Sequence, residues 1–166
     1  MDKKIRQYVG IAAALVSYYV VHEGSHLLVA LALGVFKQIR FLGLGVQIDV
    51  ESTQMSDAQM FLFCLLGAVS TLLVGYLLTA LRKKICEVPG KVFRAVMYYI
   101  TIAMLLLDPL YLSILCGFFG GGDMNGIALL VPGWGARIAF GVLFLVNCLV
   151  FAKLVLPTYK ASFENK

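Results

Sequence analysis

Two histidines and a glutamate stand inside an apolar stretch near the start of the chain. The segment VVHEGSHLLVALALG, residues 20–34, contains His22, Glu23 and His26 in an H-E-x-x-H pattern. On a helix, residues four apart project from one face about one turn apart, so both imidazoles can bind one zinc ion. Zinc acidifies a bound water molecule, and a carboxylate beside the first histidine can accept the proton. The motif predicts a hydrolytic zinc centre with Glu23 as the catalytic base.

The alternative interpretation of this motif is a chance match, with both histidines bonded to neighbouring helices. The chain has two histidines in total, and both lie in the motif. An ionised glutamate at membrane depth costs about 2.5–3.5 kcal/mol without compensation, so such groups usually have a function. These two observations favour metal binding.

The third metal ligand must come from a carboxylate, because a catalytic zinc usually takes three protein ligands and the chain has no third histidine. The candidates are Asp123 in GGGDMNG and Asp108 in LLLDPLYLS, with Asp49, Glu51 and Asp57 as weaker ones in the predicted outer loop. At 1.5 Å per helical residue, Asp108 and His22 each lie roughly 20 Å from the inner membrane edge. Asp108 is therefore level with the first histidine, although it also fits a plain proline kink.

Asp123 reaches the same region by a different route. The glycines before it allow the backbone to turn sharply, and Asp123 would then cap a short re-entrant helix over 124–131. A backbone break of this kind is tolerated at membrane depth only beside protein or a water-filled cavity. We favour Asp123 as the third ligand and Asp108 as the alternative, and both can serve if one binds the metal and the other orients a ligand.

The composition predicts an integral membrane protein. Of 166 residues, 61% are hydrophobic and 14% charged, and the mean hydropathy is +0.90, whereas soluble domains are roughly 45 to 50% apolar. The basic residues cluster at the ends of apolar runs and form no stripe with interleaved aromatics, so we expect no nucleic-acid partner. We expect one polytopic domain over residues 1–166, with the lipid bilayer as its surroundings.

The fold class expected from these patterns is an all-α membrane protein with about four transmembrane helices. The predicted spans are 8–36, 59–81, 95–117 and 137–156, each long enough to cross a hydrocarbon core. An extended segment, RFLGLGVQIDV at 40–50, follows the first span and must line a cavity or lie at the interface. Eleven of the 14 basic residues fall on one side, which predicts a multi-pass protein of the plasma or inner membrane with both termini cytoplasmic.

These motifs together resemble the site-2 protease family of intramembrane zinc metalloproteases. His22, Glu23 and His26 match its H-E-x-x-H element, GGDMNG at 121–126 looks like its glycine-flanked aspartate, and GAVS at 67–70 looks like its small-residue stretch. The chain departs from the family in having Ser25 where glycine is common and in lacking the N-P-x-x-D-G context.

The resemblance implies a compact zinc endopeptidase without a PDZ-like insertion. It would bind one zinc ion per chain through His22, His26 and Asp123, and it would hydrolyse peptide bonds of transmembrane protein substrates. Any regulatory domain would be a separate chain.

Three further expectations follow from the residues. Asn125 can hydrogen-bond the oxyanion, although a turn-favouring asparagine beside Gly126 is an equal alternative. The extended segment 41–50 can pair with an unwound substrate strand. The competing functional hypothesis is a non-catalytic metal-binding membrane protein acting as a sensor, transporter or assembly factor, which would not need Glu23.

Overall fold

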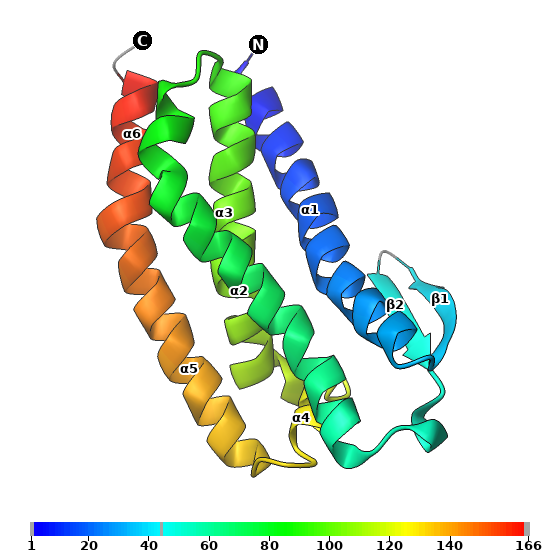
Figure 1. The fold of residues 1–166 in the computed structure, drawn as a ribbon. Helices are drawn as coiled ribbons and strands as arrows, with labels where there is room; N and C mark the ends of the chain where they lie inside the picture. Colours follow the sequence, from blue (N-terminus) through cyan, green and yellow to red (C-terminus); the bar gives the residue numbers. More distant parts are fainter. Residues whose placement is uncertain (1, 44, 165–166) are drawn as a thin grey trace.

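The computed structural model describes residues 2–43 and 45–164, which form a bundle of long helices with a β-hairpin at its side (Figure 1). The long helices are α1 (Lys3–Ala32), α2 (Asp57–Glu87), α3 (Lys91–Ser113) and α5 (Gly133–Val150). The shorter elements are β1 (Phe36–Leu42), β2 (Gly45–Val50), η1 (Ser52–Gln54), η2 (Leu115–Gly117), α4 (Asp123–Ile127), η3 (Phe151–Val155) and α6 (Leu156–Glu164). Helix dominates the described chain, as the sequence predicts.

Three helical stretches within the described residues are long and apolar enough to cross a membrane. They are α2, α3 and the continuous run Gly133–Glu164, in which the π-helical η3 joins α5 to α6. The 30-residue α1 is not among them, since His22, Glu23 and His26 lower its mean hydropathy. The membrane class thus agrees with the sequence, while the first predicted span, 8–36, and the cytoplasmic termini stay predictions.

The first helix ends earlier than the sequence predicts. It stops at Ala32 instead of continuing to residue 36, because Gly34 adopts a φ of +69° that glycine alone takes readily. The Gly34 N–H then donates to the Leu31 carbonyl and the Val35 N–H to the Ala30 carbonyl, which completes a Schellman cap. The predicted extended segment accordingly begins at Phe36, four residues before Arg40.

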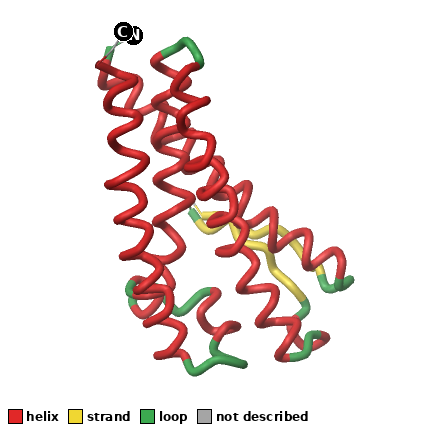
Figure 2. Tube along the Cα trace, turned by 60° about the vertical axis from the view of Figure 1, so that its left-hand side comes forward, coloured by secondary structure: helices red, strands yellow, loops and turns green. Residues whose placement is uncertain are grey.

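The hairpin lies beside the second half of α1 (Figures 1 and 2), and its Ile48 belongs to the same hydrophobic cluster as Phe63 of α2. Its strands are antiparallel, with Ile39 opposite Ile48, and β2 is the strand that packs against α1. Ile48 is buried, whereas the charged residues of the hairpin pair with one another at its exposed side: Arg40 with Asp49 at 2.6 Å and Lys37 with Glu51 at 3.3 Å. The hairpin therefore presents β2 to the bundle.

A buried polar network ties α2, α3 and α5 together. The Asn147 side chain is fully buried, accepts a hydrogen bond from the Tyr76 hydroxyl at 2.5 Å and donates one to the Leu105 carbonyl at 2.7 Å. Interhelical hydrogen bonds of this kind hold membrane helices together, because lipid provides little hydrophobic drive for association.

This network predicts the effect of two substitutions on stability. Asn147→Ala loses both interhelical hydrogen bonds and should lower the free energy of unfolding by about 1–2 kcal/mol. Tyr76→Phe loses only one of the bonds and should cost less. Thermal unfolding in detergent provides the measurement, and a larger effect of Tyr76→Phe would contradict the assignment.

Candidate metal centre

Three side chains from α1 and α4 converge on one point inside the protein. His22 and His26 are buried, at 7% and 3% exposure, and their Nε2 atoms lie 3.1 Å apart. The Asp123 Oδ2 atom lies 3.1 Å from Nε2 of His22 and 3.4 Å from Nε2 of His26. Among the described residues, these three form the group of potential ligands whose atoms are mutually close. Asp123, the favoured candidate, thus joins the two histidines.

The outer nitrogens of both imidazoles face acceptors. The Nδ1 atom of His22 lies 3.1 Å from Oδ1 of Asp108, and Nδ1 of His26 lies 2.9 Å from the carbonyl oxygen of Phe63. Both Nδ1 atoms therefore donate to these acceptors, so in the neutral imidazoles each Nε2 presents a lone pair inward. Two lone pairs and a carboxylate oxygen then repel one another unless a positive charge lies between them.

The spacing of the three inward atoms fits a tetrahedral zinc ion. Ligand bonds of about 2.0–2.2 Å place tetrahedral ligands about 3.3–3.6 Å apart. The observed separations are 3.1, 3.1 and 3.4 Å, so each lies in this range or about 0.2 Å below it. The donor set of two imidazoles and one carboxylate also suits zinc and leaves a fourth position for water or substrate.

Asp108 lies on the opposite side of the His22 ring from the converging atoms. Its carboxylate is 1% exposed and accepts hydrogen bonds from the hydroxyls of Tyr18, at 2.5 Å, and Thr71. Its oxygens face Nδ1 of His22, so Asp108 fixes the orientation and tautomer of that ring.

Tyr18 and Thr71 were missed by the sequence reasoning. Tyr18 precedes His22 by four residues and so shares its helix face, a signal that was available. Thr71, on another helix, carried no comparable signal.

Gly67 on α2 permits the close approach of both histidine rings. A Cβ atom at this position would lie 2.7 Å from Nε2 of His26 and 2.9 Å from Nε2 of His22. These distances are shorter than van der Waals contact, so any side chain at residue 67 would displace the rings. The small-residue stretch noted in the sequence thus contacts the site directly.

Glu23 lies beside the converging group and bonds to the hairpin. Its Oε2 atom accepts a hydrogen bond of 3.2 Å from the Ile48 N–H on β2. Glu23 also lines a cavity of about 490 Å³ together with His22 and Asp123, so its carboxylate has access to space for a ligand. A second cavity of about 560 Å³ lies along β2 and also reaches Asp123.

The segment before Asp123 differs in detail from the expected helix cap. The N-cap of α4 is Gly122, and the helix ends at Ile127 instead of Val131. Positive φ angles of 81°, 89° and 50° at Gly120, Gly121 and Gly122 explain why three successive glycines occur there. Asp123 is consequently the first helical residue instead of the cap.

The remaining candidates lie as follows. The Asn125 amide lines the second cavity and donates to the Gly120 carbonyl at 3.1 Å, which fits a turn residue, so its oxyanion role stays a prediction. Asp49 and Glu51 form their ion pairs on the hairpin, and Asp57 begins α2. Within the described residues, none of these three weaker candidates joins the histidines.

No protein-family model matches the chain, and no curated protein or solved structure is detectably similar to it.

The Gly67 contact predicts a specific sensitivity of metal binding. Gly67→Ala should weaken zinc affinity roughly tenfold, since overpacking a site typically costs 1–3 kcal/mol. Gly24→Ala is the matched control, because a Cβ atom at Gly24 meets nothing within 4 Å. Zinc titration of the purified proteins with a competing chelator provides the measurement, and equal affinities for the two variants would contradict the role of Gly67.

Proposed function

We propose that this chain is an intramembrane zinc metalloprotease, similar to the site-2 protease family, that hydrolyses peptide bonds of transmembrane proteins. The observation that carries the proposal is the convergence of His22, His26 and Asp123 at tetrahedral spacing, with the Glu23 carboxylate on the wall of the adjoining cavity. A site that only binds metal has no need of a carboxylate in that position.

Each residue of the site has a separate role in the proposed hydrolysis. When bound, zinc would polarise the scissile carbonyl and activate water. Glu23 accepts the proton of the attacking water and then donates it to the leaving amine nitrogen. Asp108, held by Tyr18 and Thr71, keeps the His22 ring in the tautomer that leaves Nε2 free.

The free edge of β2 supports binding of the substrate as a strand. One edge of β2 pairs with β1, while the Ile48 N–H on the other edge points to Glu23. Residues 45–47 of β2 line one cavity and residues 47–50 line the other, and both cavities reach Asp123. A substrate helix must unwind before cleavage because its carbonyl groups are hydrogen-bonded, and an unpaired strand edge offers replacement hydrogen bonds.

Metal content tests the ligand assignment. One zinc ion per chain is expected in the native protein purified without chelator, measured by elemental mass spectrometry. His22→Ala and Asp123→Ala should each remove the metal. Asp108→Asn should retain zinc with affinity reduced about 10- to 100-fold, because it loses an orienting contact and not a ligand. Loss of zinc in Asp108→Asn but not in Asp123→Ala would reverse the assignment.

The role of Glu23 is tested by cleavage of reconstituted transmembrane helices carrying helix-breaking residues, followed by mass spectrometry. Glu23→Gln should retain zinc and lose about 10²- to 10⁴-fold in rate, as expected for removal of a general base. Glu51→Gln makes the same chemical change on the exposed hairpin and should leave the rate unchanged. Full activity of Glu23→Gln would favour the non-catalytic metal-binding alternative.

A further inference from the structure

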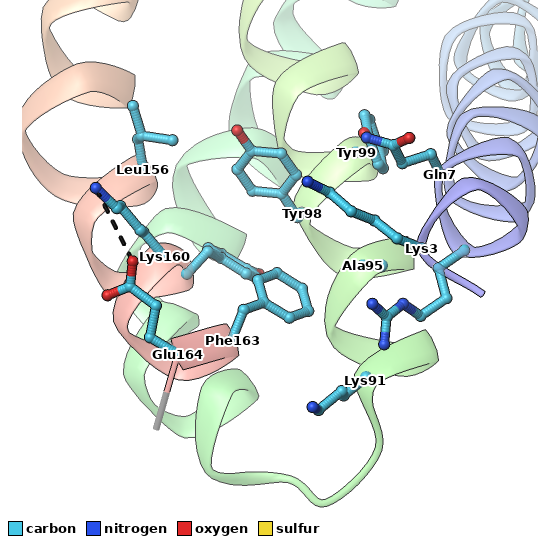
Figure 3. A pocket seen from close by; sticks show the side chains of 12 residues that line it. Lys3, Gln7, Lys91, Ala95, Tyr98, Tyr99, Leu156, Lys160, Phe163 and Glu164 are labelled. Atoms are coloured by element: carbon cyan, nitrogen blue, oxygen red, sulfur yellow. Dashed lines mark ion pairs between the residues drawn. The ribbon is translucent and has the colours of Figure 1, made fainter. Parts of the chain in front are cut away.

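A further cavity, separate from the two beside Asp123, lies at the end of the bundle that holds both chain ends and the α2–α3 turn (Figures 1 and 3). This terminal cavity has a volume of about 540 Å³ and is enclosed by α1, α3 and α6. Its α1 residues Lys3 and Arg6 are remote from the metal centre, since Arg6 precedes His22 by 16 residues, or about 24 Å of helix. The proposed protease chemistry does not use this cavity.

The terminal cavity combines aromatic walls with basic side chains. Tyr98, Tyr99, Tyr159 and Phe163 supply the aromatic surface, and Lys3, Arg6, Lys91 and Lys160 supply the positive charge. Figure 3 shows Lys3, Lys91 and Lys160 arranged around Tyr98 and Phe163. A ligand that fits must therefore carry negative charge beside an apolar part.

Positive charge in the terminal cavity is largely uncompensated. Glu164 is the acidic lining residue, and it pairs only loosely with Lys160 at 4.0 Å. Over the described ranges 2–43 and 45–164, no acidic side chain forms an ion pair with Lys3, Arg6 or Lys91. Within the described residues, the cavity thus offers three cationic side chains that form no ion pair and can bind an anion.

Two buried groups add to this environment. Arg94 is 2% exposed, has no ion-pair partner in the described part of the chain, and places its guanidinium carbon 5.7 Å from the ring centre of Phe163. The hydroxyl of Tyr159, a lining residue, is buried without a hydrogen-bond partner among the described residues. The Arg94 Nη1 atom donates to the Cys86 carbonyl at 3.4 Å, and an anion in the cavity would add favourable electrostatic energy to the guanidinium charge.

We propose that the terminal cavity binds the phosphate headgroup of an anionic phospholipid. Lysine and arginine side chains supply the hydrogen bonds and charge that a phosphate needs, and basic pockets between membrane helices take such headgroups. The cavity also lies at the end of helices long enough to cross a membrane, where headgroups are at high concentration. The apolar walls favour a lipid over a free phosphate, because they can cover the glycerol backbone and first methylene groups.

Native mass spectrometry of the full chain in detergent tests the proposal, with dioleoyl phosphatidylglycerol and dioleoyl phosphatidylcholine as probes. Phosphatidylglycerol should bind at least about tenfold more tightly than phosphatidylcholine. The triple variant Lys3→Gln, Arg6→Gln, Lys91→Gln should lose this preference, since basic residues near anionic headgroups each add a severalfold factor in affinity. Free glycerol 1-phosphate serves as the competitor.

A control variant separates the cavity from general charge. Lys4→Gln, Lys83→Gln, Lys84→Gln removes the same charge from exposed residues that do not line the cavity, and it should keep the preference within about twofold. Equal losses in the two triple variants, or equal binding of both lipids, would overturn the proposal. Displacement of lipid by an equal concentration of glycerol 1-phosphate would overturn the choice of a lipid.

Gel filtration shows whether the first triple variant folds. If it does not, a single substitution tests the same proposal. The Lys91 side chain is exposed, so Lys91→Gln alone should fold and should lower phosphatidylglycerol affinity severalfold. Unchanged affinity in this folded variant would count against the cavity. Because no readout here involves zinc or cleavage, the outcome is independent of the proposed function.

Discussion

The close approach of the two α1 histidines to Gly67 on α2 is the contact on which the candidate metal centre depends. Because residue 67 has no side chain, the Nε2 atoms of His26 and His22 can lie only 2.7 and 2.9 Å from the position that a Cβ atom would take. Their outer nitrogens are held by Asp108 and the Phe63 carbonyl, so the rings cannot rotate without losing a buried hydrogen bond. The packing of α1 on α2 therefore also fixes the orientation of both imidazole rings. Asp123 can complete a group of ligands only because both Nε2 atoms are held in this orientation.

Buried polar groups require compensation, and the contacts of α1 show how the protein provides it. Tyr18 and His22 contact the same Asp108 carboxylate, while Thr71 reaches it from α2. Each of these polar side chains has its hydrogen-bonding group paired with another, which reduces the free-energy cost of burying them. On the neighbouring face, the Ile48 N–H compensates Glu23 with a single hydrogen bond, so this carboxylate remains the least constrained member of the site.

The sequence was enough to name the side chains that converge at the site, but it did not predict all of the backbone geometry that brings them together. Regular spacing predicted that His22 and His26 share a face, and depth arithmetic predicted that Asp108 is level with His22. Boundaries at Gly34 and Gly122 were wrong by a few residues, because they depend on individual positive φ angles that hydropathy does not encode. Thr71 was not foreseen, since its role follows from the rotation of α2 about its own axis, which only packing against α1 determines.

Asp123 joins α1 from a point about 100 residues later in the chain, through three glycines whose backbone conformations carry a large entropic cost when ordered. An ion held by His22, His26 and Asp123 would therefore act as a cross-link that closes a long loop, comparable in topology to a disulfide. Its binding free energy would be shared with the folding of the α3–α4 connection, so metal supply and the mature conformation would be thermodynamically linked.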